Sequence, residues 1–251
     1  MLKSILFALV MLFTGFTTIS AQTPQKRFEE ANNLFNQSKF TEAARTYQQL
    51  IDEGYHQTSL YFNAGNAWYK AGKTGMAVYN YEKALQQSPN NQSVKHNLDI
   101  ANQKVDGFVG ELPLVFFQQW WQNLRLLHTP NGWATGVIIF FWLFIAGVAL
   151  TRFLPGRSRK YIAIANYVTA VLTLLYLSVA ISTYLSANDH STGVIMAQHK
   201  VKSAPDETSR DIFEVGEGVK VHVTDATNEY CKIELADGKS GWISCAAIKR
   251  L

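Results

Sequence analysis

The chain has 251 residues and a net charge of +4, from 23 Lys and Arg against 19 Asp and Glu. This near balance excludes a strongly basic nucleic-acid binder, and two cysteines are too few for a disulfide scaffold or a four-cysteine zinc site. No charged residue occurs between Arg125 and Arg152 or between Lys160 and Asp189. Each gap exceeds the roughly 20 apolar residues that a membrane-spanning helix needs, which excludes a single soluble globule.

Residues 1–21 are predicted to be a signal peptide. Lys3 precedes an apolar run from Ile5 to Phe13, and small residues before Ala21 provide a cleavage site after it. An uncleaved membrane anchor is the alternative interpretation. Both interpretations place the following segment outside the cytoplasm.

Residues 22–104 contain an internal repeat with a period of about 34 residues. The second copy resembles the tetratricopeptide (TPR) repeat at signature positions occupied by Gly65, Trp68, Ala77, Tyr81, Ala84 and Pro89. The first copy matches at Ala31, Leu34, Ala43, Tyr47 and Leu50, with Tyr55 in place of the proline. The segment from Ser93 to Lys104 is predicted to be a closing helix. Small residues let paired helices approach, large ones fill the gaps, and stacked hairpins form a concave surface.

The resemblance implies that aromatic and amide side chains line this concave surface. Such a groove suits a helix or an extended peptide of a partner protein, although a merely solvated surface is the alternative. The candidate protein-binding residues are Phe28, Asn32, Phe35, Asn36, Phe62, Asn63, Asn66, Tyr69 and Lys70. One TPR subclass grips a C-terminal carboxylate, but Phe28, Ser93 and Asn97 stand where it has cations, so that ligand is not expected.

Residues 105–131 form an aromatic juxtamembrane segment. Phe116-Phe117 and Trp120-Trp121 are typical of the membrane–water interface, where an aromatic ring is buried while its polar tip stays hydrated. We therefore expect a helix from Leu112 to Leu127 that lies at the outer interface. A partner-binding helix is the alternative.

Residues 132–154 and 161–185 are predicted to be transmembrane helices. The connection around residues 155–160 is basic, because four cations and no acid lie between Arg152 and Lys160. This charge indicates a cytoplasmic loop and therefore an out-in-out hairpin. Asn166 and Thr169 are expected to bond across the helix pair. The near absence of ionisable residues within the spans argues against a transporter.

Residues 186–192 form a linker, and residues 193–251 alternate between apolar and polar side chains. Asp237-Gly238 between two alternating runs indicates a hairpin, and the short strands predict a small closed or partly open barrel. The segment resembles the bacterial SH3-like domain, most clearly at Gly241-Trp242-Ile243, with Tyr230 where that family often has Trp. Tyr230 and Trp242 are candidates for a ligand surface, although a Trp at the position of Trp242 is more often part of the core of such a small barrel.

Cys231 and Cys245 are a candidate disulfide, which an exported location permits. A three-residue turn centred on Gly238 would place the two cysteines directly opposite each other, whereas a two-residue Asp-Gly turn would offset them by one residue. If they are not bonded, they are small apolar core residues. Both outcomes remain open at this point.

No catalytic motif, phosphate loop or metal-ligand spacing occurs in the sequence. We therefore expect a protein that is not an enzyme and that has no cofactor and no metal. Both soluble segments match binding modules instead.

The order of parts resembles BatE-type proteins of the Bacteroides aerotolerance (Bat) operons: signal peptide, TPR array, two-helix transmembrane hairpin and all-β SH3-like barrel. The resemblance implies a multi-domain, two-pass protein of the inner (cytoplasmic) membrane with both modules in the periplasm. It further implies a non-catalytic scaffold in a stress-related envelope complex with membrane-anchored von Willebrand factor A-domain partners. A sensor that binds peptidoglycan or cell-wall peptide through the SH3-like segment is the alternative. No nucleic-acid partner is expected.

Overall fold

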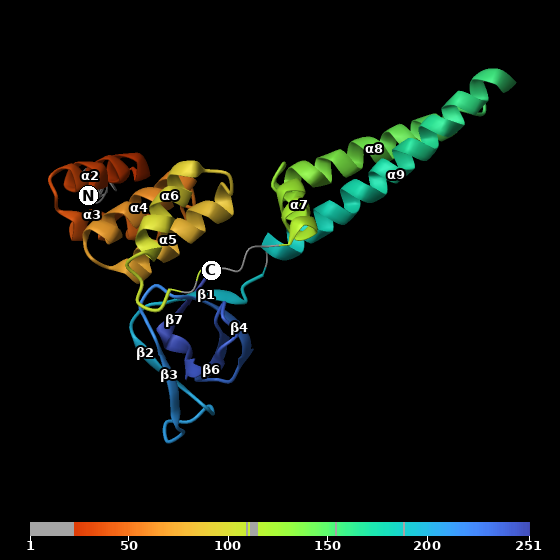
Figure 1. The fold of residues 1–251 in the computed structure, drawn as a ribbon. Coiled ribbons are helices and arrows are strands. Elements are labelled where there is room, and N and C mark those ends of the chain that lie inside the picture. Colours follow the sequence, from red (N-terminus) through yellow and green to blue (C-terminus); the bar gives the residue numbers. More distant parts are fainter. Residues whose placement is uncertain (1–22, 109, 111–114, 154, 188) are drawn as a thin grey trace, which may run out of the picture.

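The computed structural model describes residues 23–108, 110, 115–153, 155–187 and 189–251, so the predicted signal peptide lies outside the described residues. Within these residues the chain forms eight α-helices and one seven-stranded sheet. Figure 1 shows three parts: a helical array in red to yellow, a long helix hairpin in green to cyan, and a blue sheet beside the array.

The helical array has five helices with a strict repeat. They are α2 (Pro24–Asn36), α3 (Phe40–Asp52), α4 (Thr58–Lys70), α5 (Thr74–Gln87) and α6 (Gln92–Asn102). The first residues of α2, α4 and α6 are evenly spaced along the chain, and α5 follows α3 at the same spacing. The predicted repeat array with a closing helix is therefore confirmed.

The array packs small residues against large ones, as the sequence predicted. Ala31, Ala43 and Ala77 are fully buried, and Tyr81 is 1% exposed. A Cβ added at Gly65 would lie 2.6 Å from Cε1 of Tyr81. The two helices of the second repeat are therefore so close at Gly65 that any larger residue there would displace the ring of Tyr81.

The turns between paired helices use the same backbone conformation with different residues. Ser38 has φ of 62° and its counterpart Gly72 has φ of 76°. Only glycine adopts this left-handed region without a steric cost. We expect Gly72→Ser to lower the free energy of unfolding by about 1 kcal/mol, and Ser38→Gly to leave it unchanged or raise it. Thermal unfolding of the two variants checks this, and equal losses in both would contradict it.

The helix hairpin consists of α8 (Pro130–Leu150) and α9 (Gly156–Ala187), which lie side by side (Figure 1), with α7 (Phe116–Arg125) at its base. The stretches Asn131–Leu150 and Ser158–Ser186 are long and apolar enough to cross a membrane, by length and composition alone.

The predicted loop at residues 155–160 is wrong, because α9 already begins at Gly156. Ser158, Arg159 and Lys160 lie in its first turns instead. Arg and Lys are good helix formers, and no proline follows Gly156 to stop the helix. The basic residues therefore extend the second helix, and the connection is shorter than expected.

The contact between α8 and α9 differs from the prediction for Thr169. Its hydroxyl donates to the carbonyl oxygen of Asn166 in its own helix at 3.0 Å, because a threonine in an apolar helix satisfies its hydroxyl on the preceding turn. The Asn166 side chain instead packs directly over Gly147 of α8, where an added Cβ would overlap its Oδ1. Thr169 therefore does not bond across the pair.

The C-terminal part is an antiparallel sheet with the strand order β3-β2-β6-β5-β4-β1-β7. The strands are β1 (Thr192–Ile195), β2 (His199–Lys202), β3 (Asp211–Val215), β4 (Lys220–Ala226), β5 (Tyr230–Glu234), β6 (Ser240–Ser244) and β7 (Ile248–Arg250). The edge strands β3 and β7 do not pair among the described residues, so the predicted barrel is an open sheet and its closed form is wrong. The physical reason is that the short β7 pairs with β1 alone, while β3 extends as a hairpin with β2.

The β5–β6 turn differs from both turn geometries that the sequence suggested. Glu234 pairs with Ser240, so the turn holds five residues centred on Asp237. Cys231 consequently lies opposite Ile243, two positions away from Cys245. Cys245 begins the short 3-10 helix η1 (Cys245–Ala247), and the structure joins the two cysteines with a Cα–Cα distance of 5.0 Å.

The helical array and the sheet dock directly against each other, a contact that the sequence analysis missed. The backbone N–H of Gly75 donates to Glu217 Oε1 at 2.8 Å. Helix α5 has no capping side chain of its own, so a carboxylate from the sheet caps its N-terminus. Lys249 Nζ also lies 4.4 Å from the ring centroid of Tyr79. The two modules thus form one body, which we call the array–sheet body.

Candidate functional site

A cavity of about 320 Å³ opens on the helical array between the first two repeats. Its lining residues are Asn32, Phe35, Asn36, Tyr47, Asn63 and Asn66. Five of them are among the candidate groove residues that the sequence predicted. The sixth, Tyr47, was interpreted only as a residue that fills the gap between hairpins.

Tyrosines and asparagines form the same hydrogen-bond pattern twice. The hydroxyl of Tyr47 donates to Asn32 Oδ1 at 2.6 Å, and Asn63 Nδ2 donates to the same oxygen at 3.3 Å. One repeat later, the hydroxyl of Tyr81 and Nδ2 of Asn97 donate to Asn66 Oδ1 at 2.8 and 2.7 Å. We call this set of six side chains the amide ladder.

The amide ladder fixes the orientation of Asn32 and Asn66. A carbonyl oxygen has two lone pairs, and both are occupied in each of these side chains. Within the described part of the chain, the Nδ2 groups of Asn32 and Asn66 themselves have no hydrogen-bond partner. Each amide therefore presents two N–H donors and no free acceptor site, which suits a ligand that offers carbonyl oxygens.

The tyrosine hydroxyls of the amide ladder stay protonated at neutral pH. Burial raises the pKa of Tyr47 to about 12. Burial likewise raises the pKa of Tyr81 well above its usual value. Both hydroxyls therefore remain hydrogen-bond donors throughout the physiological range.

The remaining candidate residues of the array lie outside the cavity. Phe28 contacts Tyr47 with ring centroids 5.7 Å apart, and Phe62 contacts Tyr81 at 6.2 Å. Tyr69 lies beneath the ammonium group of Lys104, which is 4.2 Å from the ring centroid. Lys70 is an exposed residue at the end of α4. Phe28 and Phe62 therefore support the ladder tyrosines from the side.

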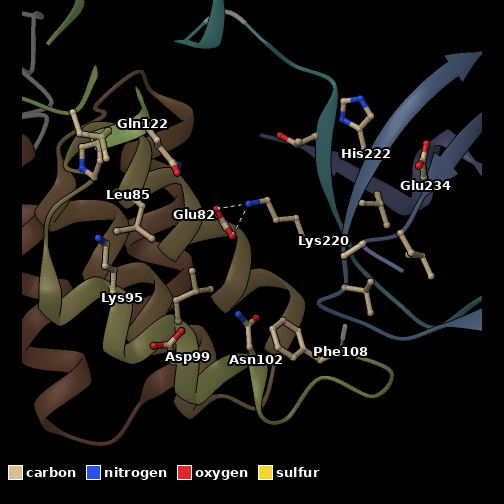
Figure 2. Close-up of a pocket in the computed structure, with 18 residues that line it drawn as sticks. Glu82, Leu85, Lys95, Asp99, Asn102, Phe108, Gln122, Lys220, His222 and Glu234 are labelled. Carbon is tan, nitrogen blue, oxygen red and sulfur yellow. Dashed lines mark hydrogen bonds and ion pairs between the residues drawn. The ribbon is translucent and has the colours of Figure 1, made fainter. Parts of the chain in front are cut away.

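A second cavity, of about 820 Å³, lies between α5, α6, α7 and the sheet. Figure 2 shows that the ion pair between Glu82 and Lys220 crosses it, with a nitrogen–oxygen distance of 3.3 Å. Lys95 and Asp99 line the array side, and Glu234 lines the sheet side. Because charges of both signs line it, this cavity has no strong preference for anions or cations.

Tyr230 and Trp242 lie on the outer face of the sheet. Their strands alternate, so that Cys231, Ile233 and Ile243 are buried, while Tyr230 and Trp242 are half-buried on the opposite face. A position inside the core is therefore wrong for Trp242. The two rings sit on neighbouring strands, where Tyr230 pairs with Ser244 and Trp242 with Lys232.

The described residues contain no group of three or more His, Cys, Asp or Glu side chains that could hold a metal ion.

Residues 59–91, which span α4 and α5, match the tetratricopeptide repeat family. The chain contains a TPR repeat. Because TPR domains generally bind partner proteins, this match and the helical array favour a role in protein–protein interaction. A comparison with curated proteins found no match.

Proposed function

We propose that this protein is a non-catalytic, membrane-anchored scaffold that holds a partner protein in the groove of its TPR array. The observation that carries the proposal is the amide ladder. It directs the N–H groups of Asn32 and Asn66 toward a ligand, and the cavity beside them is bordered by Phe35.

The groove chemistry fits an extended peptide segment. Its backbone carbonyls would accept hydrogen bonds from the two oriented amides, and an apolar side chain would pack against Phe35. The ladder holds the donors in place before binding, which reduces the entropy cost of ordering them.

The docking of the two modules supports an even number of membrane crossings. The array precedes the hairpin in the chain and the sheet follows it, and Gly75 nevertheless bonds to Glu217. Modules in direct contact must lie on the same side of a membrane. The basic residues between Arg152 and Lys160 favour the cytoplasm for the hairpin connection, which supports a periplasmic location for both modules. A Cys231–Cys245 disulfide suits that oxidising compartment.

The partner we propose is a membrane-anchored von Willebrand factor A-domain protein in a stress-related, aerotolerance-type envelope complex. This follows from the resemblance to BatE-type proteins. The ligand that we propose for the groove is therefore a protein on the periplasmic side of the membrane.

The test uses the full chain in its native membrane with a photoreactive residue at position 36. We expect crosslinking to a von Willebrand factor A-domain protein, and a loss of about tenfold when Phe35→Ala and Asn66→Leu are introduced. Glu30→Ala, at an exposed site on α2 outside the cavity, is the control and should keep the crosslink. A crosslink that is indifferent to the groove variants would overturn the proposal.

A second candidate function is binding of cell-wall peptide through the sheet. It is favoured by Tyr230 and Trp242, which share the outer face of neighbouring strands. The full chain in detergent should then pellet with purified cell wall, and Trp242→Ala should abolish pelleting. Pelleting that does not depend on Trp242 would dismiss this candidate.

A further inference from the structure

Helix α7 has an aromatic face and an amide face. Phe116, Trp120 and Leu124 recur every four residues, and Phe117 and Trp121 follow one position later. The intervening positions are Gln118, Gln119, Gln122 and Asn123. With a length of ten residues, the helix is too short to cross a membrane, but its two faces suit an interface.

The helix is bound to the end of α9 that leads into the sheet. Trp121 Nε1 donates to the hydroxyl of Ser182 at 3.3 Å, and the Arg125 guanidinium donates to the hydroxyl of Ser186. Ser186 is the last residue of the second candidate membrane span. In Figure 1, α7 lies at the base of the hairpin, on the side of the array–sheet body. These contacts place α7 at the level where the apolar span ends.

The aromatic face of α7 is directed away from the array–sheet body. Phe116 is 84% exposed, Phe117 67% and Trp120 56%. Gln122, on the opposite face, lines the large cavity between the array and the sheet (Figure 2). The exposed apolar surface continues onto the last turns of α9, where Leu185 is 63% exposed.

We infer that the aromatic face of α7 is embedded in the outer monolayer of the membrane, at the boundary between headgroups and acyl chains. The inference rests on the proposed membrane insertion of α8 and α9. Trp and Phe favour this layer, and a helix with one apolar face lies flat in it. Continuity with the lipid-facing surface of the hairpin identifies lipid, rather than a second protein, as the occupant of this face. The helix thereby fixes the height of the TPR groove above the membrane.

The experiment uses the full chain in phosphatidylcholine vesicles with brominated acyl chains, which quench tryptophan by contact. Three variants each keep one of the six tryptophans, with the others replaced by phenylalanine. Bromolipid should quench Trp120 about twofold and leave Trp68, in the array, unchanged. Trp142, inside the first candidate span, reports whether the hairpin is inserted at all.

The outcomes separate this inference from the proposed membrane anchoring. Quenching of Trp142 without quenching of Trp120 would overturn the inference and leave the anchoring intact. Quenching of neither residue would overturn both. Protection of Trp120 from bromolipid and from aqueous acrylamide together would indicate a protein occupant and would also overturn the inference.

A second measurement needs no substitution. The wild-type chain in vesicles with a photoactivatable acyl chain should carry lipid adducts on the peptide from Phe116 to Arg125 after illumination. Adducts on the hairpin peptides with none on α7 would contradict the inference.

Discussion

Opening the Cys231–Cys245 disulfide is expected to lower the free energy of unfolding of the sheet by about 3 kcal/mol. The cysteines are 14 positions apart in the sequence, so the bridge closes the short loop that contains the β5–β6 hairpin. Closing a loop of this size removes conformational freedom from the unfolded chain, which accounts for most of the expected effect. The bridge also ties η1, and with it β7, to a central strand of the sheet.

The full chain in nanodiscs is unfolded with denaturant, with and without a thiol reductant. The fluorescence of Trp242, which lies in the sheet, gives the unfolding midpoint. The double variant Cys231→Ala with Cys245→Ala should show the same loss, and reductant should not affect it further. Because Cys231 is 1% exposed, reduction of the folded wild type should be slow. Identical unfolding midpoints for the oxidised and reduced wild type would refute the prediction.

The helical array was predictable because its determinants are local. The repeat period indicates which face of each helix is buried. The resemblance to the TPR repeat then implied that Asn32, Phe35 and Asn66 line the groove, and all three border the cavity. The role of Tyr47 could not be predicted, since its hydroxyl reaches from α3 to Asn32 on α2. A repeat pattern marks tyrosine as a packing residue without indicating where its hydroxyl bonds. The recurrence of Tyr47 as Tyr81, together with Asn32 as Asn66, was the available signal.

The sheet was less predictable because strand register depends on turn geometry. Asp237-Gly238 correctly indicated a hairpin, and Gly238 has φ of 83°. The turn is nevertheless centred on Asp237 and not on Gly238, since Glu234 pairs with Ser240 and Leu235 N–H donates to the carbonyl oxygen of Lys239. A dipeptide does not distinguish this turn from shorter ones, and the difference moves Cys245 out of the paired strand into η1.

The docking of the modules could not be predicted from sequence patterns, because Glu217 lies 142 positions from Gly75. One local signal was nevertheless visible. Helix α5 begins after Lys73, and its first turn has no acidic residue or side-chain cap. An uncapped helix start that is held near other structure needs a hydrogen-bond acceptor from elsewhere, and Glu217 supplies it.

Replacing Gly216 with valine is expected to separate the array from the sheet while both keep their folds. An added Cβ at Gly216 would overlap the carbonyl oxygen of Asp106. This oxygen belongs to the backbone, so it cannot move aside as the end of a flexible side chain could. Separation also breaks the bond from Gly75 to Glu217, and a hydrogen bond to a charged group contributes about 1.5 to 3 kcal/mol. It exposes Val105, which is 6% exposed when docked, at a cost of roughly 1.5 kcal/mol.

Spin labels at Glu29 on α2 and Lys239 in the β5–β6 turn, both exposed, report the distance between the modules in nanodiscs. The wild type should give one narrow distance distribution and Gly216→Val a broad one. Hydrogen exchange at the Gly75 amide should accelerate by about tenfold or more. Gly156→Val is the matched control, because no atom lies within 4 Å of a Cβ there.

The result bears on the groove because α5 serves both surfaces. Its Tyr81 donates to Asn66 in the amide ladder, while its Glu82 pairs with Lys220 of the sheet. If docking braces this helix, Gly216→Val should also weaken the position-36 crosslink to the partner, although no groove residue is changed. A narrow distance distribution in Gly216→Val would contradict the predicted separation, whereas a broad distribution with an unchanged crosslink would show that the sheet has no part in holding the groove.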